Sequence, residues 1–278
     1  NNTKTIGSSA FQFCRSLKTF AIDIENSKLS ELGPFSFYET SITEINIPPN
    51  IKVIQNSVFN ECKYLKQVNI SNKSKLETIE EHSFSSNLSL KTINIPESIS
   101  NLSFKAFINT PSLIKIMNKS NSQFIVQSNN EVYMKDNSLI FVPRNLKEFE
   151  VIKNCSVIHS GSFCGPNLEK VTFQDDSLTS IEESGFAHST SLKNIAIPKS
   201  IKDIGNDAFI ECRNLETVLF NLNSTLKIIP QYCFAFSGLK NVVLPRSVEI
   251  IDKSSVITSY ELTPIARIEA TCEKDGNK

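Results

Sequence analysis

The side chains of this sequence that could do chemistry are its histidines and paired acidic residues. The chain has three histidines, His82, His159 and His188, and two acidic pairs, Glu80-Glu81 and Glu182-Glu183. A hydrolytic site would need a nucleophile within hydrogen-bond reach of a base, or two carboxylates at one place. The histidines fall in different slots of the repeat and the two acidic pairs in different coils, and no spacing brings such a site together. We therefore expect solvated surface residues, no catalytic residue and no enzymatic activity.

The cysteines show no metal-ligand spacing either. The chain has 7 cysteines, without a C-x-x-C pair or a histidine–cysteine cluster of the kind that holds zinc. An odd count leaves at least one thiol without a partner in the chain. A disulfide between Cys155 and Cys164 stays open as an alternative to free thiols. We expect no metal and no cofactor.

Composition excludes several classes of function. The 278 residues carry 29 basic and 29 acidic side chains, for a net charge of +0. Proteins that bind nucleic acid depend on excess basic charge, so a nucleic-acid partner is not expected. The sequence has no G-x-G-x-x-G or P-loop motif for nucleotides. It also has no run of about 18 apolar residues, so we expect no membrane span. The first residue is Asn, and any targeting signal would lie outside this sequence.

Two motifs alternate along the chain. The first is an Ile or Leu five residues before a Phe, and three of these Phe residues follow one another at a step of 23. It occurs as Ile6/Phe11, Leu32/Phe37, Ile54/Phe59, Ile79/Phe84, Leu102/Phe107, Ile158/Phe163, Ile181/Phe186, Ile204/Phe209 and Ile229/Phe234. The second is L-x-x-I-x-I, at residues 17–22, 42–47, 65–70, 90–95, 168–173, 192–197, 215–220 and 239–244.

The second motif predicts a strand, because its apolar residues alternate with polar ones and Pro follows directly in several copies. One unit of about 23 residues cannot bury its apolar face alone, so the units must stack. We expect a leucine-rich-repeat solenoid, a curved rod of about 10–11 coils over residues 1–260. A parallel sheet forms one face, and short helical or 3-10 turns and short strands form the other. Residues 261–278 read as a C-terminal cap or polar tail.

The spacing between Phe107 and Phe163 exceeds the repeat. The excess contains two apolar runs, Val132-Tyr133-Met134 and Leu139-Ile140-Phe141-Val142, around Lys135-Asp136-Asn137-Ser138. Strand-forming runs around a polar turn predict a β-hairpin. We expect an inserted hairpin near residues 125–143, with a disordered loop as the alternative.

The full pattern S-I-x-x-I-G-x-x-A-F-x-x-C-x-x-L-x-x-I-x-I-P resembles the BspA-like, Treponema pallidum-type leucine-rich repeat. The copies nearest to it are residues 200–220, 177–198 and 79–96, and the resemblance covers roughly residues 3–260. The Asn-rich, Gly-poor composition is similar to that of the protozoan, Trichomonas-like members. The resemblance implies a cell-surface or secreted protein that adheres to host cells, matrix or other microbes. The family has no motif for catalytic residues to carry over.

One slot of the pattern varies in chemistry. The position three residues after the Phe holds Cys14, Cys62 and Cys212, and elsewhere it holds small or polar residues such as Thr40 and Asn87. We expect its side chains to bond the backbone of the turn, which is a structural role.

The open face of the sheet is where such a solenoid binds a partner. One outward column reads Ala21, Asn46, Asn69, Asn94, Met117, Glu150, Thr172, Ala196, Leu219 and Val243. The early coils therefore show asparagine, the middle is charged, and the late coils show exposed apolar side chains, which favour binding. The expected partner-binding face consists of Ala196, Thr217, Leu219, Asn241, Val243, Glu148 and Glu150. A small patch, or one covered by the C-terminal tail, is the alternative.

N-x-S/T sequons are frequent, although an Asn- and Ser-rich chain makes several by chance. Besides Asn1, the candidate N-glycosylation sites are Asn69, Asn72, Asn87, Asn101, Asn118, Asn154 and Asn223. A glycan on Asn69, at the open face, would exclude the early coils from docking. Together these patterns predict an adhesive, protein-binding ectodomain at the cell surface or secreted. An intracellular scaffold is the first alternative, and a hydrolase or carbohydrate-active site in the insert is a remote one.

Overall fold

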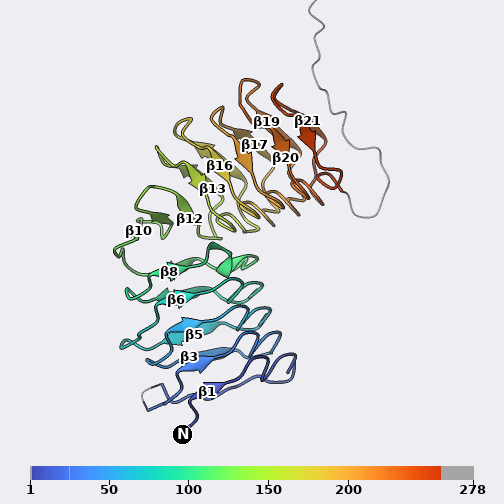
Figure 1. Cartoon of the computed structure of the whole chain (residues 1–278). Helices are drawn as coiled ribbons and strands as arrows, with labels where there is room; N and C mark the ends of the chain where they lie inside the picture. The colour runs from blue at the N-terminus through green and yellow to red at the C-terminus, as the bar shows by residue number, and fades with distance from the viewer. Residues whose placement is uncertain (1, 25, 258–278) are drawn as a thin grey trace, which may run out of the picture. The chain divides into compact units, whose positions relative to one another are not determined.

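The computed structural model, which describes residues 2–24 and 26–257, is a parallel β-solenoid with almost no helix (Figure 1). A typical coil contributes a short strand, a turn segment around the repeat Phe, and a longer strand. The coils fall into two compact units: unit 1 comprises Asn1–Leu146 with His159–Gly165, and unit 2 comprises Lys147–Ile158 with Pro166–Lys278. The expected solenoid class is confirmed.

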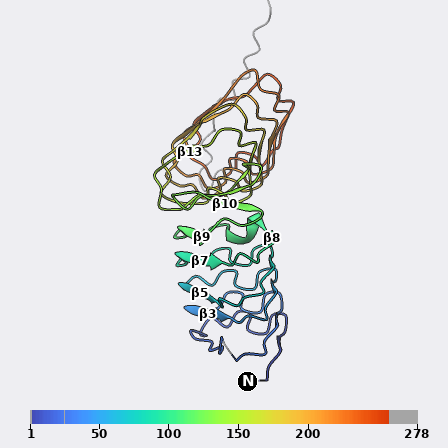
Figure 2. The same cartoon turned by 90° about the vertical axis from the view of Figure 1, so that its left-hand side faces the viewer.

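In unit 1 the longer strands lie along one side and the short strands along the other (Figure 2). The longer strands are β3 (Glu44–Ile47), β5 (Gln67–Ile70), β7 (Thr92–Ile95) and β9 (Lys115–Met117). The short strands are β1 (Thr5–Ile6), β2 (Glu31–Leu32), β4 (Val53–Ile54), β6 (Thr78–Ile79) and β8 (Asn101–Leu102). Neighbours pair in parallel. In the first coil, residues 17–22 carry the strand motif but form no strand.

Unit 2 repeats this arrangement. Its longer strands are β13 (Glu148–Val151), β15 (Lys170–Phe173), β17 (Asn194–Ile197), β19 (Thr217–Phe220) and β21 (Asn241–Val243), in that order across one parallel sheet. Its short strands are β14 (Val157–Ile158), β16 (Ser180–Ile181), β18 (Asp203–Ile204), β20 (Ile228–Ile229) and β22 (Ile250–Ile251).

The repeat Phe residues form stacks inside the coils. In unit 1 the rings of Phe37 and Phe59 lie 5.6 Å apart, and those of Phe84 and Phe107 also lie 5.6 Å apart, nearly parallel. Phe37 and Phe59 are fully buried. Close aromatic packing of this kind adds to the free energy of burial. The sequence motif thus marks the core.

The turn segments differ from the expected helical turns. Only η1 (Phe104–Phe107) is a 3-10 helix among the described coils. Elsewhere the residues two before and two after the Phe have positive φ: Ser9 and Phe13, Phe35 and Glu39, Ser57 and Glu61, His82 and Ser86, Ser184 and His188, Asp207 and Glu211, Tyr232 and Phe236. Each left-handed residue other than Gly costs roughly 1 kcal/mol. Hydrogen bonds to the next coil offset this cost, such as Phe11 N–H to the Ser36 carbonyl at 2.8 Å.

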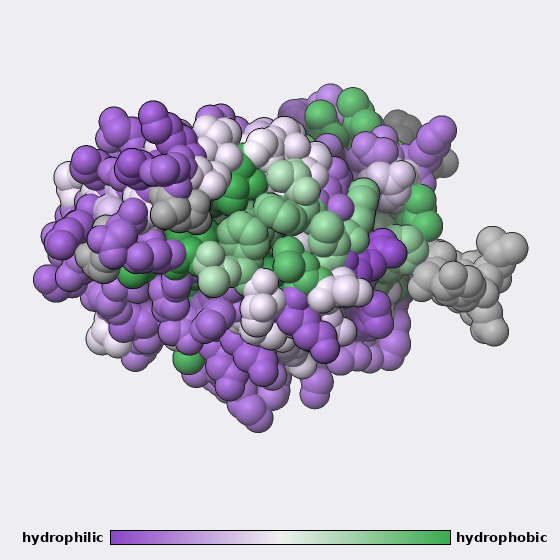
Figure 3. Space-filling view, turned by 90° about the horizontal axis from the view of Figure 1, so that it is seen from below, coloured by the Kyte–Doolittle hydropathy of each residue, from purple (hydrophilic) through white to green (hydrophobic). Residues whose placement is uncertain are grey.

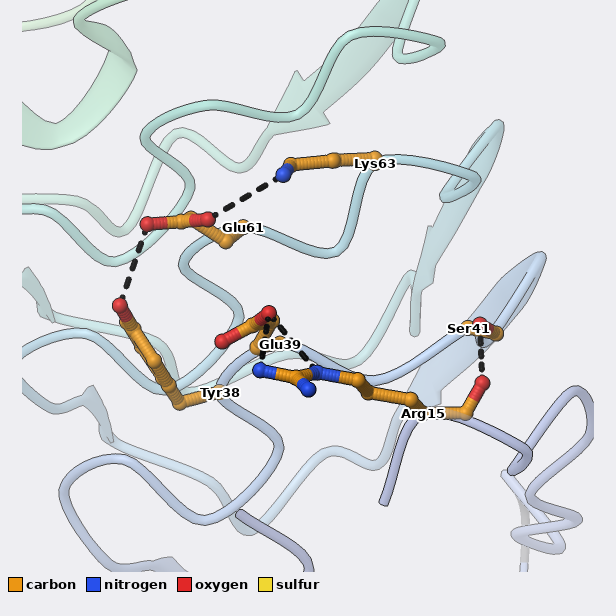
Figure 4. A network of polar contacts seen from close by, with 6 residues as sticks. All are labelled: Arg15, Tyr38, Glu39, Ser41, Glu61 and Lys63. Carbon is orange, nitrogen blue, oxygen red and sulfur yellow. Dashed lines mark hydrogen bonds and ion pairs between the residues drawn. The ribbon is translucent and has the colours of Figure 1, made fainter. Parts of the chain in front are cut away.

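On the turn side of unit 1, polar side chains connect the first three coils (Figure 4). An ion pair joins the first coil to the second, a hydrogen bond joins the second to the third, and a further ion pair lies within the third. Arg15 Nη2 lies 2.8 Å from Glu39 Oε1, and Lys63 Nζ lies 3.4 Å from Glu61 Oε2. The Tyr38 hydroxyl donates to Glu61 Oε1 at 3.1 Å. Partial burial, followed by this contact with Glu61, raises the pKa of Tyr38. Exposed pairs of this kind contribute little to stability, so we assign them a local ordering role.

The inserted hairpin forms between β11 (Val132–Met134) and β12 (Leu139–Phe141), which pair antiparallel. A third strand, β10 (Phe124–Val126), adds to the outer edge of β11. A buried Arg144 fixes the end of the insert. Its guanidinium donates to the carbonyls of Val142 at 3.0 Å, Ser162 at 2.5 Å and Gly161 at 2.7 Å. Because burial disfavours its charge, the pKa of Arg144 falls to about 10.

Candidate partner-binding face

The outward side chains of the unit 2 sheet form two columns, because adjacent strands pair in register. Glu148 pairs with Lys170, Lys170 with Asn194, Asn194 with Thr217, and Thr217 with Asn241. Two residues further along each strand lie Glu150, Thr172, Ala196, Leu219 and Val243. The columns predicted from the repeat motif are therefore the columns of the sheet.

The second column ends in an exposed apolar row. Ala196 pairs with Leu219, and Leu219 pairs with Val243. Leu219 is 54% exposed and Val243 is 38% exposed, while Val218 and Val242, which precede them in the two strands, are buried in the core. Water is a poor solvent for such a row, and its burial against another protein would be favourable. Thr217 is half-buried and Asn241 is exposed beside it.

A hollow of about 450 Å³ opens where β15 and β17 end, next to Ala196. Phe173, Asp175, Asp176 and Lys199 line it. Lys199 Nζ lies 3.4 Å from Asp176 Oδ2. The backbone amide of Asn154 donates to Asp175 Oδ2 at 3.0 Å, and this bond is the main reason that the pKa of Asp175 lies below its usual value. The apolar row thus adjoins a hollow with a fixed carboxylate.

The other end of the unit 2 sheet is acidic and polar. Glu148 and Glu150 on β13 are both exposed. Gln174 Nε2 donates to Glu150 Oε2 at 2.8 Å. The face therefore changes from acidic to apolar between β13 and β21, as the sequence predicts.

The matching face of unit 1 is polar and internally bonded. Asn69 Nδ2 donates to Asn46 Oδ1 at 2.9 Å, and Gln67 Nε2 donates to Asn69 Oδ1 at 2.6 Å. The expectation that Met117 points outward is wrong, because Met117 is buried and only 2% exposed. The register between β7 and β9 shifts between Thr92 and Ile95, so Met117 pairs with the inward Ile95.

The structure also corrects one glycosylation candidate. Asn87 is fully buried, and its Nδ2 donates to the carbonyls of Phe59 at 3.0 Å and Phe84 at 2.8 Å. No glycan fits on this amide in the folded chain. Asn69 is half-buried with its amide bonded to Asn46. The remaining candidates are exposed: Asn72, Asn101, Asn118, Asn154 and Asn223.

One polar cluster escaped the sequence reasoning. His159 Nε2 lies 3.0 Å from Ser138 Oγ, and that hydroxyl donates to Asp136 Oδ1 at 2.6 Å. The order differs from a hydrolytic triad, in which the carboxylate bonds the histidine. Ser138 is 1% exposed, so no substrate reaches its hydroxyl. The cluster anchors the hairpin turn, and it could not be found from spacing because His159 lies in a different coil.

The remaining candidates for chemistry lie apart from one another. His82 Nδ1 is 3.3 Å from Ser85 Oγ, and His188 Nδ1 is 3.6 Å from Glu211 Oε2. No disulfide joins any two of the six described cysteines, and the alternative of a Cys155–Cys164 disulfide is therefore not formed. Within residues 2–24 and 26–257, no group of histidine, cysteine or acidic residues could hold a metal ion. No helix in the same part of the chain is long and apolar enough to cross a membrane.

Comparison with known proteins gives a family pattern and a set of similar folds. The pattern of the BspA type leucine rich repeat region matches in 6 copies, over residues 1–114 and 136–264. A comparison with curated proteins finds no match.

Three solved structures share the fold. The pneumococcal vaccine antigen PcpA is 22% identical with a TM-score of 0.69, over 96% of this chain and 77% of that one. A leucine rich cell surface protein from Faecalibacterium prausnitzii is 23% identical with a TM-score of 0.64, over 93% and 70%. A leucine-rich repeat protein from Eubacterium ventriosum is 20% identical with a TM-score of 0.65, over 84% and 72%. None of these names describes an enzymatic activity.

Proposed function

The chain belongs to the BspA-type leucine-rich repeat family, and from this membership we propose that it is a non-enzymatic, adhesive protein-binding domain. Its partner is a protein on a cell surface or in an extracellular matrix. The domain acts at the cell surface or after secretion. The similarity to a protein described as a cell surface protein supports this location.

We place the partner-binding face on the unit 2 sheet. The observation that carries this proposal is the in-register row of Ala196, Leu219 and Val243, with Leu219 54% exposed. Binding hot spots are desolvated apolar centres surrounded by polar residues. Thr217 and Asn241 supply polar neighbours here, and the hollow beside Ala196 can receive a partner side chain.

Binding of the soluble chain to intact epithelial cells and to immobilised matrix proteins tests the proposal. The variant Leu219→Asp/Val243→Asp puts two carboxylates into the apolar row without touching the core. Its matched control is Thr92→Asp/Asn94→Asp, which adds the same charge at exposed outward positions of β7. We expect saturable binding that is lost at least tenfold in the first variant and kept in the control.

Two results would contradict the proposal in different ways. If both variants bind as well as the wild-type chain, adhesion stands but the binding face does not lie on the unit 2 sheet. If the wild-type chain binds to no cell or matrix surface, the proposed adhesive function is wrong. Circular dichroism of each variant establishes that it remains folded.

The cysteines favour a second candidate, an intracellular scaffold. No disulfide joins any two of the six described cysteines, and thiols persist in the reducing cytosol. Protease treatment of intact source cells separates the two candidates. A surface protein is digested under this treatment, and an intracellular scaffold is protected.

A further inference from the structure

The hollow beside Ala196, here called the unit 2 hollow, combines an apolar lining with one excess negative charge. Its volume is about 450 Å³, and its apolar lining includes Phe173, Ile197 and Pro198. Its charged lining residues are Asp175, Asp176 and Lys199, which are two carboxylates against one ammonium. Lys199 Nζ lies 3.4 Å from Asp176 Oδ2, so the charge of Asp175 is the excess.

Backbone amides hold the Asp175 carboxylate in a fixed orientation. Asn154 N–H donates to its Oδ2 and Ser177 N–H donates to its Oδ1, each at 3.0 Å. The pKa of Asp175 lies below its usual value, chiefly because of the bond from Asn154, so the carboxylate is charged at neutral pH. An ionised carboxylate has about four acceptor positions, more than these amides occupy. It can therefore also accept hydrogen bonds from a cationic ligand.

Arginine is the cationic side chain that suits this lining. Its planar guanidinium donates two parallel N–H groups to one carboxylate and also stacks on aromatic rings, whereas lysine carries a compact point charge. Phe173 is half-buried and lines the unit 2 hollow. The methylene groups of an arginine pack along apolar surface while its charged head keeps polar contacts. The unit 2 hollow offers both kinds of surface together.

Two other hollows have no excess charge in their lining. In unit 1 a hollow of about 420 Å³ opens at the ends of β5 and β7, where Asn72 lies two residues after β5 as Asp175 lies two residues after β15. Its charged lining residues, Glu97 and Lys119, form an ion pair at 3.4 Å. The hollow of the first coil, which Phe20 lines, has no charged lining residue, and Figure 3 shows hydrophobic side chains gathered on that coil. Of the three, the unit 2 hollow is the one that favours a cation.

The distance between the unit 2 hollow and the apolar row sets the spacing of a partner's side chains. Neighbouring strands lie about 4.8 Å apart, so Leu219 on β19 lies roughly 7 Å from a hollow between β15 and β17. In an extended segment, side chains two residues apart point to the same side and also lie roughly 7 Å apart. An extended segment that crosses the strands can therefore fill the hollow and cover the row at once.

We propose that the partner of the unit 2 sheet presents an arginine to the unit 2 hollow and, two residues further along an extended segment, an apolar side chain to Leu219 and Val243. The guanidinium binds the Asp175 carboxylate, and the arginine stem packs on Phe173. Arginine is among the side chains that carry most of the binding energy at protein interfaces. The arginine anchor rests on the proposed function, because it gives the chemistry of the partner at the same face.

Fluorescence anisotropy with the full chain tests this chemistry. The probe is the fluorescein-labelled peptide Gly-Arg-Ser-Phe-Gly, and its matched control carries citrulline, which has nearly the shape of arginine and no charge. We expect the arginine probe to bind roughly fivefold more tightly than the citrulline probe at low salt. NaCl at about 0.5 M should reduce this difference, because it screens exposed charges. An arginine probe that does not bind, or that binds no better than the citrulline probe, would overturn the proposal.

Three variants locate the site. Asp175→Asn nearly keeps the shape of the side chain and removes its charge, so the preference for the arginine probe should fall below about twofold. Asp203→Asn is the matched control, because it removes an exposed carboxylate from β18 among the short strands, and the preference should persist. Lys199→Ala removes the ammonium that repels arginine, so the arginine probe should bind roughly twofold more tightly, a readout that does not depend on the folding of Asp175→Asn. A preference kept in Asp175→Asn, or arginine binding unchanged in Lys199→Ala, would contradict the proposal.

Binding to cells and matrix proteins separates the arginine anchor from the proposed function. If Asp175→Asn binds these surfaces like the wild-type chain while Leu219→Asp/Val243→Asp does not, the face is right and the arginine anchor is wrong. If the wild-type chain binds no surface but prefers the arginine probe, the adhesive function is wrong and the arginine site stands. Loss of surface binding in both variants, with binding kept in Asp203→Asn, supports both proposals.

Discussion

Cys62 and Phe37 are joined by a hydrogen bond between adjacent coils, in which the Cys62 thiol donates to the Phe37 carbonyl at 3.1 Å. Cys212 makes the same bond to Phe186 at 3.1 Å. Asn87 takes this place in another coil and bonds Phe59. The slot three residues after the Phe therefore supplies a buried donor to the turn, as its chemistry in the sequence indicates.

A matched pair of substitutions tests the need for this donor. Thr already occupies the slot at Thr110, whose hydroxyl donates to the Phe107 carbonyl at 2.6 Å. Cys62→Thr and Cys62→Val have nearly the same shape and differ in the hydroxyl. We expect the free energy of unfolding of the Val variant to be about 1–3 kcal/mol lower than that of the Thr variant, because Val gives the turn backbone no side-chain donor. Urea denaturation measures the difference, and equal stabilities would contradict the assigned role.

Burial of the thiols makes stability depend on alkaline pH. Burial raises the pKa of the Cys62 thiol from its ordinary value near 9 to about 11, and it also raises the pKa of Cys164 and Cys233. A thiol that keeps its proton in the folded chain contributes stability that is fully present below pH 9. That contribution is lost as the pH rises through the folded pKa.

The free energy of unfolding should therefore fall between about pH 9 and pH 11, by on the order of 2–3 kcal/mol for Cys62 alone. Denaturation at a series of pH values measures this loss. The Cys62→Thr variant is the control, and it should lose less stability over the same interval. An identical pH dependence of both proteins would contradict the prediction.

Accessibility of the sequons decides which asparagines can carry glycans. When the chain is secreted from a glycosylating cell, we expect Asn87 to remain unmodified, because its amide is buried and bonded to two carbonyls. Asn72 and Asn118 are exposed at the ends of their strands and can be modified. Intact-mass measurement of two sequon variants checks this. Ser74→Ala should remove one glycan mass, and Ser89→Ala should remove none.

Replacement of the buried Arg144 should cause a large loss in the free energy of unfolding. Its guanidinium is buried and donates to three backbone carbonyls. Arg144→Ala removes one donor from each of those carbonyls and empties a buried site, and we expect a loss of about 3–5 kcal/mol in the free energy of unfolding. Lys147→Ala is the control: it removes an exposed ion pair with Glu169 and should cost less than about 1 kcal/mol. Similar losses for both variants would show that Arg144 does not fix the insert.

Much of the fold and the face could be predicted from the repeat. A coil has one interior, so the residues that fill it must return at a fixed spacing, and Phe59 and Phe84 appear in the sequence as clearly as in the core. The outward columns follow from the same spacing, since side chains alternate along a strand. Leu219 and Val243 were therefore predictable as exposed neighbours.

Other features depend on contacts between distant parts of the chain. A shift of register between β7 and β9 turns Met117 inward, and no local pattern signals such a shift. His159 meets Ser138 only because the insert folds against the neighbouring coil. The burial of Asn87 was indicated by its position three residues after Phe84, where the repeat places a donor to the turn. Its sequon instead suggested an exposed side chain. By itself the sequence determined the repeat, the core and the outward columns, because a stack of equal coils imposes them at every turn. Tertiary structure alone decided the register shift and the third strand of the insert, because these depend on which neighbour each coil meets.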